Sequence, residues 1–184
     1  MIQVTGATER EFTFPAEPAT ALAFYNDLGR ITDCLTHITL EKQLAPDQGR
    51  VLYKTRELGA YTVRIFCDLQ TIPDWNNLVL TVRPLENAVP IPPSSGFYST
   101  QAYGRFASES RFYPDGAHTR IAYKLQLEAR LPSPFGLRLI PGGVLNHIAA
   151  SITNGRIHEI VNGFIQKSIA AFPQWQKQQL TINR

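Results

Sequence analysis

Two histidines come first, because imidazoles at helical spacing can hold a metal ion or move protons. His147 and His158 are eleven residues apart in a stretch with helical periodicity, so a helix would stack them on one face. The helical rise separates them by about 16 Å, too far for both to bind one metal ion. No CxxC or HExxH pattern occurs in the chain. We therefore predict that this polar line is the solvated flank of a helix, and we expect neither a metal nor a cofactor.

Carboxylates and thiols are the next groups that could do chemistry. Glu9 and Glu11 share one face of a predicted strand, where a buried pair could act as general acid and base, but the neighbouring Arg10 favours a solvated pair. Cys34 and Cys67 lie in no thiol motif, so we expect both to be buried as small apolar side chains. The chain has no GxSxG motif and no Gly-rich phosphate loop. We predict no catalytic residue. An enzyme would need a titratable side chain in the apolar interior, and the candidates are those whose strand phase stays open: Arg56, Glu57 and Glu109.

Composition limits the classes of protein to consider. The chain has 184 residues, 43% hydrophobic and 18% charged, which fits one globular domain over residues 1–184. No apolar run is long enough to cross a membrane, and the polar start is unlike a secretory signal, so we expect a cytoplasmic protein, free or peripheral to a membrane. No dense Lys/Arg run occurs, so no nucleic-acid partner is expected.

Charge is unevenly distributed along the chain. Residues 1–102 hold 8 Lys/Arg against 11 Asp/Glu, whereas residues 103–184 hold 10 against 4. The basic second half could meet an anionic membrane surface or an acidic protein, or it could be an ordinary solvated surface.

Most of the chain shows the two-residue period of strands. A first strand over Val4–Phe14 precedes two short helices, which begin at Pro18 and are separated near Gly29. Alternating apolar and polar residues then predict six further strands, at His37–Leu44, Val51–Leu58, Tyr61–Ile72, Leu78–Val82, Tyr98–Phe112 and Thr119–Leu131. A long amphipathic helix follows over about Val144–Trp175, and Pro173 should end it or kink its last turn.

Two loops interrupt this pattern. Pro84–Gly96 holds four prolines in thirteen residues and cannot be a central strand. Pro132–Gly143 is rich in proline and glycine yet carries Phe135, Leu137, Leu139 and Ile140 between Arg130 and Arg138. Such an apolar loop either docks on an anionic membrane or folds back to plug one end of the core.

This order of elements resembles the START and birch-pollen-allergen (SRPBCC) superfamily and its α+β helix-grip fold. In that fold a curved antiparallel sheet of seven strands wraps around a long C-terminal helix, with two short helices after the first strand. The resemblance covers about Gln3–Gln176 and rests on element order and lengths. The stretches THITLEKQL and GFYSTQAYGRF also look like a cyanobacterial and chloroplast branch of unknown function. An eight-stranded barrel of lipocalin type is the rival architecture, and it accounts less well for the terminal helix.

A ligand cavity between sheet and helix is what the resemblance implies. Composition alone leaves open whether the small helix residues Ala149, Gly155 and Gly163 leave a cavity or allow close packing. Strand alternation selects the residues expected to face it, with Ser108 a candidate to bond a polar group of the ligand. The predicted ligand-binding residues are Val63, Ile65, Leu80, Tyr98, Phe106, Ser108, Tyr123, Leu125, Leu145, Ile152 and Phe164.

The predicted function is non-catalytic binding or carriage of a small hydrophobic ligand, such as a lipid, isoprenoid or pigment. Entry would be gated by the proline loop, which covers the cavity mouth in START-like folds, and by the 132–143 loop. Two alternatives stay open. One is a protein- or membrane-docking assembly factor of a photosynthetic membrane complex, and the other is a cyclase- or hydrolase-like enzyme on an apolar substrate.

Overall fold

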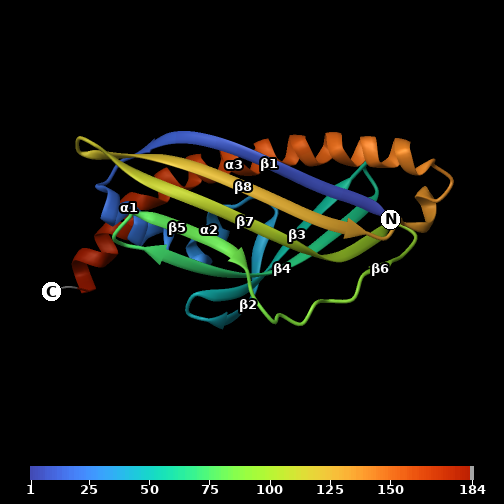
Figure 1. Ribbon diagram of the computed structural model, residues 1–184, viewed down its shortest axis with the longest axis horizontal. Helices are drawn as coiled ribbons and strands as arrows, with labels where there is room; N and C mark the ends of the chain where they lie inside the picture. Colours follow the sequence, from blue (N-terminus) through green and yellow to red (C-terminus); the bar gives the residue numbers. More distant parts are fainter. Residues whose placement is uncertain (183–184) are drawn as a thin grey trace.

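The structure is a computed structural model, and it describes residues 1–182. A curved sheet wraps around one long helix (Figure 1). The strands are β1 (Ile2–Phe14), β2 (Ile38–Ala45), β3 (Gln48–Glu57), β4 (Tyr61–Asp74), β5 (Val79–Pro84), β6 (Ser94–Ser95), β7 (Ser99–Asp115) and β8 (His118–Leu131). The helices are α1 (Pro18–Tyr25), α2 (Leu28–Cys34) and α3 (Gly142–Ile182), with a short 3-10 turn at Phe135–Leu137.

The strands form one open sheet in the order β1-β8-β7-β5-β4-β3-β2. Neighbours on this path run antiparallel, and β7 also pairs parallel with β4 beyond the end of β5. Because β1 and β2 are the edges of this path, the sheet is not a closed barrel, and the lipocalin-type alternative is wrong. The helix-grip fold predicted from the sequence is confirmed; the two-residue β6, inside the proline loop, was not predicted.

Close approach of α3 to β1 depends on a glycine in the strand. A Cβ built on Gly6 would overlap Cδ1 of Ile157 on α3. The two helix glycines, which we expected to face the sheet, neither line the cavity nor pack against a strand. Gly155 has open space around it and faces solvent, and Gly163 lies beside Thr36. Of the three small helix residues, only Ala149 lines the cavity.

Three predicted boundaries are wrong for local reasons. The break between α1 and α2 falls at Asn26–Asp27, because Asp27 caps α2 by accepting from the Arg30 amide, and Gly29 lies inside that helix. Strand β4 continues through Pro73 to Asp74, where a turn was expected to begin. Helix α3 continues past Pro173 to Ile182. Phe172 and Trp175 flank that proline, and both pack on Phe24. This packing holds the helix together where the proline cannot donate a backbone hydrogen bond.

Two ends of the molecule differ in how they are filled. One end, near the C-terminus, holds an aromatic cluster built from β1, α1, β7 and α3, which we call the aromatic end: Phe14, Phe24, Tyr25, Phe112, Phe164, Phe172 and Trp175. The opposite end, at the N-terminus in Figure 1, brings together residue 1, the β3–β4 turn, the segment before β7 and the loop between β8 and α3. We call it the loop end.

Candidate functional site

A cavity of about 230 Å³ lies between the concave face of the sheet and α3. Its wall is almost entirely apolar, with side chains from the sheet strands, from α2 and from the inner stripe of α3. The cavity lies below the usual range of roughly 300–1,000 Å³ for ligand pockets. Such a space suits a compact molecule.

Ten of the eleven predicted ligand-binding residues line this cavity. Strand alternation predicted the inner face for Val63, Ile65, Leu80, Phe106, Ser108, Tyr123 and Leu125, and the apolar stripe of the long helix did so for Leu145, Ile152 and Phe164. That these residues bind a ligand stays a prediction. Tyr98 is the exception, since it is 56% exposed and does not line the cavity. It lies just before β7 begins, where its ring packs against Tyr61 and Phe97 at the loop end.

Hydroxyl groups interrupt the apolar wall near its middle. Tyr123 on β8 and Ser108 on β7 are each 91% buried and line the cavity. Ser108 is the polar neighbour of the Tyr123 hydroxyl. Burial raises the pKa of Tyr123, which keeps the phenol neutral and able to donate. These hydroxyls can hydrogen-bond a polar atom of a molecule in the cavity.

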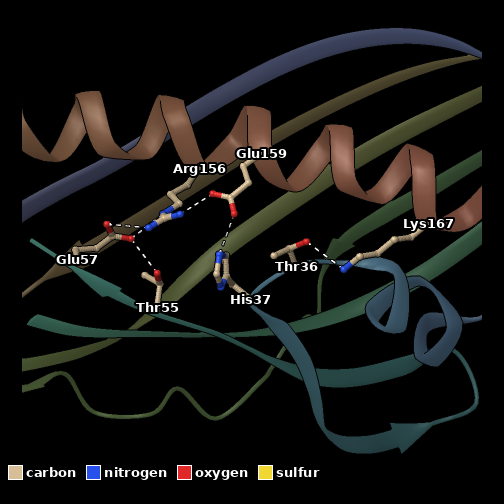
Figure 2. Close-up of polar contacts among 7 residues, drawn as sticks. All are labelled: Thr36, His37, Thr55, Glu57, Arg156, Glu159 and Lys167. Atoms are coloured by element: carbon tan, nitrogen blue, oxygen red, sulfur yellow. Dashed lines mark hydrogen bonds and ion pairs between the residues drawn. The ribbon is translucent and has the colours of Figure 1, made fainter. Parts of the chain in front are cut away.

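An ion-pair network joins α3 to β3 beside the cavity. Figure 2 shows Arg156 of α3 pointing toward Glu57, with Glu159 reaching His37. Arg156 Nε donates to Glu57 at 2.9 Å, and the Thr55 hydroxyl donates to the same carboxylate at 3.0 Å. His37 Nε2 lies 3.2 Å from Glu159.

The network holds Arg156 and Glu159 in their charged forms. Hydrogen bonds to Glu57 and Glu159 raise the pKa of Arg156, and the bond from Arg156 lowers the pKa of Glu159. Both Glu57 and Arg156 line the cavity, whereas Arg56 is exposed and Glu109 pairs with Arg111 on the surface. Of the three titratable side chains considered for catalysis, Glu57 is therefore the one that reaches the cavity. Its carboxylate already accepts hydrogen bonds from Arg156 and Thr55, so its role is to link α3 to β3.

Some wall residues were not predicted, although a pattern indicates them. Tyr53 and Thr55 share the parity of Val51 on β3, so alternation alone places them on the inner face. The same parity decides the strand phase of Glu57, which was left open. Arg156 lies four residues after Ile152 and four before Ile160, within the inner stripe of α3. Burial raises the pKa of Tyr53 to about 12, so it too stays neutral.

The proline loop lies away from the cavity, contrary to our expectation. No residue between Val82 and Thr100 lines the cavity. Arg50 fixes this loop on the outer face of the sheet: it pairs with the buried Asp68 at 2.7 Å and donates to the Val89 carbonyl at 2.9 Å. Tyr103 donates to the same carboxylate. A role for this loop in gating the cavity mouth therefore has no support here.

The other groups singled out from the sequence lie outside the cavity wall, with the exception of Cys67. His147 and His158 are exposed on α3, as predicted for a solvated flank. Glu9 and Glu11 pair across strands with Lys124 and Arg120 on the surface. Both cysteines are free and buried. Residues 1–182 contain no group of three or more His, Cys, Asp or Glu side chains that could hold a metal ion, and no helix among them is long and apolar enough to cross a membrane.

Comparison with solved structures places the fold among known ones. The Zhui aromatase/cyclase from Streptomyces sp. R1128 matches with a TM-score of 0.55 at 13% identity, over 92% of this chain and 94% of that one. A protein from Thermus thermophilus matches with a TM-score of 0.53 at 18% identity, over 90% of this chain and 99% of that one. A STAR-related lipid transfer protein from Xanthomonas axonopodis matches with a TM-score of 0.50 at 11% identity, over 91% and 85%.

These likenesses show that the chain has the helix-grip fold of START-like and aromatase/cyclase proteins. No protein-family model matches the sequence, and no curated protein matches it. The suggested kinship with a cyanobacterial and chloroplast branch stays a prediction.

Proposed function

We propose that the chain binds a compact apolar molecule carrying one neutral hydrogen-bonding group, such as a hydroxyl or carbonyl, without catalysing a reaction. The observation that supports this function is the apolar cavity with two hydroxyls, Tyr123 and Ser108, buried in its wall. Burial of the ligand's apolar surface would supply most of the affinity, and the hydroxyls would orient it. The names of similar folds, an aromatase/cyclase and a lipid transfer protein, agree with an apolar ligand.

The volume of the cavity narrows the ligand further. At about 230 Å³ it favours a small ring system or a short isoprenoid over a two-chain lipid. Four charged residues line the cavity, and two of them, Arg156 and Glu57, pair with each other. Because the wall is mostly apolar, a charged ligand would lose much of its hydration there, which favours a neutral ligand.

Titration with 2-naphthol tests this function, using two variants of adjacent helix residues. Ala149→Phe fills the cavity, because Ala149 lines it, whereas Ala150→Phe adds the same ring to the exposed side of α3. We expect wild type and Ala150→Phe to bind the probe alike and Ala149→Phe to bind at least about tenfold more weakly. Circular dichroism confirms that each variant is folded. Equal binding by both variants, or no binding by the wild type, overturns the proposal.

A further inference from the structure

Exposed apolar side chains concentrate at the loop end. Leu139 is 97% exposed, and Phe97 is 61% exposed. Seven of the twelve exposed large hydrophobic residues lie at this end, and we call them the apolar tip: Met1, Leu58, Phe97, Tyr98, Phe135, Leu139 and Val144. An exposed apolar cluster of this kind marks an interaction site.

Backbone contacts hold this tip in place. The Phe135 amide donates to the Gly96 carbonyl at 3.2 Å, and the Gly136 amide donates to the Phe97 carbonyl at 3.4 Å. The loop between β8 and α3 therefore divides its apolar residues. Leu137 and Ile140 pack into the core, as the plug alternative predicts, whereas Phe135 and Leu139 project outward. Their exposure is therefore not a failure of the loop to fold back.

The β3–β4 turn adds an independent sign. Leu58 has a φ of 50°, in the left-handed region that favours glycine or asparagine, and its side chain is 57% exposed. A leucine at this position gains neither a favourable backbone conformation nor full burial. An exposed leucine here is explained if an apolar partner covers this surface.

One cation lies among the apolar side chains of the tip. The loops that build the loop end, residues 58–60, 96–98 and 132–141, hold a single charged side chain, Arg138. Its guanidinium lies 3.8 Å from the centroid of the Phe135 ring. An exposed apolar cluster that includes a cation complements a bilayer that carries negative headgroups.

We propose that the loop end docks on the surface of an anionic phospholipid bilayer, with the apolar tip inserted among the acyl chains and Arg138 at the headgroups. A bilayer suits this tip because its exposed apolar side chains come from four separate segments and lie beside the Arg138 cation. The inference goes beyond the proposed function, since it does not depend on what the cavity holds. Leu58, Tyr61 and Leu137 line the cavity near this end, so docking would bring the cavity against the membrane.

Vesicle co-sedimentation tests the proposal with the full chain. The probes are vesicles of pure phosphatidylcholine and vesicles of phosphatidylcholine mixed with phosphatidylserine. We expect binding to the mixed vesicles that weakens as salt rises. Leu139→Ser should weaken it by about tenfold, because burying a leucine contributes roughly 1.5–3 kcal/mol. Arg138→Gln should weaken it by about fivefold, and only on the anionic vesicles.

Trp75→Ser is the matched control, because Trp75 is 50% exposed in the β4–β5 turn, away from the loop end. It should bind vesicles like the wild type. The proposal is overturned if neither vesicle pellets the protein, or if Leu139→Ser and Trp75→Ser behave alike. Concentration-dependent dimers lost in Leu139→Ser, without vesicle binding, would instead assign the tip to a second copy of this chain. Leu139→Ser should still bind 2-naphthol like the wild type. This measurement distinguishes a failure of membrane docking from a failure of the proposed ligand binding.

Discussion

The aromatic end and the loop end use apolar residues in opposite ways. At the aromatic end, Phe14, Phe24 and Phe172 meet with ring centroids 4.9 to 5.6 Å apart, and Phe14 has no exposed surface. At the loop end, Phe97, Phe135 and Leu139 face outward. Between them lies the cavity, which the sheet and α3 leave unfilled. The aromatic end therefore holds the fold together, whereas the loop end is free to bind a partner.

Removing a ring from the aromatic end should have the largest effect on stability. Phe24→Ala deletes a side chain that is 1% exposed and stacks on four aromatic neighbours, so we expect a loss of about 3–5 kcal/mol in the free energy of unfolding. Leu139→Ala should change it by less than about 0.5 kcal/mol. Urea unfolding measures both, and losses of similar size would break the distinction between the two ends.

Cutting the ion pair beside the cavity should have a smaller effect. Arg156→Met leaves the Glu57 carboxylate, whose side chain is 13% exposed, without its cation, and we expect a loss of roughly 1–3 kcal/mol. Lys124→Met is the control, because its pair with Glu9 lies on the open surface and should contribute less than about 1 kcal/mol. If the two variants unfold at the same urea concentration, the pair does not fasten α3 to β3.

Removing the buried phenol should change selectivity more than stability. Tyr123→Phe deletes the hydroxyl and keeps the ring. We expect the preference of the protein for 2-naphthol over naphthalene to fall by about 2- to 12-fold, the value of one hydrogen bond. Ser110→Ala is the comparison, because Ser110 lines the cavity on the same strand and face as Ser108. An unchanged preference in Tyr123→Phe would show that the hydroxyl does not contact the probe.

Alkaline pH should lower the free energy of unfolding, with little effect near neutral pH. Burial raises the pKa of Cys67 from 9.0 to about 12, so between these values the folded state keeps a proton that the unfolded state loses. Stability is therefore intact below about pH 9 and falls as pH rises, by roughly 1 kcal/mol at about pH 10. Urea midpoints across this range measure it. Cys67→Ala should flatten the first part of the decline, and a flat curve in the wild type would contradict the assignment.

Much of the fold follows from the sequence because each long strand has a clear alternation. In β8, Ile121, Tyr123 and Leu125 face one way, Arg120, Lys124 and Gln126 face the other, and the three apolar residues are buried as predicted. Tyr98 was misplaced because it lies one residue before β7, where the strand's alternation no longer decides which way a side chain points.

Other features depend on contacts that no local pattern records. Continuation of α3 through Pro173 depends on Phe24, some 150 residues earlier in the chain. Close packing depends on the strand glycine Gly6 rather than on the helix glycines. Placement of the proline loop on the outer face depends on Asp68, whose partners Arg50 and Tyr103 come from two other strands. Which ligand binds likewise depends on the shape of the cavity, which forms only when sheet and helix come together. The role in assembling a photosynthetic membrane complex stays a prediction.

Methyl NMR during a titration with 2-naphthol tests the central claim, a ligand enclosed between sheet and helix. The account predicts contacts from the probe to methyl groups of the cavity wall, on Ile65, Leu125 and Ile152, with the exposed methyls of Leu44 and Leu180 unaffected. Contacts confined to Leu139 and Val144 at the apolar tip would contradict it, because they would place the apolar ligand on the surface and leave the cavity without a function.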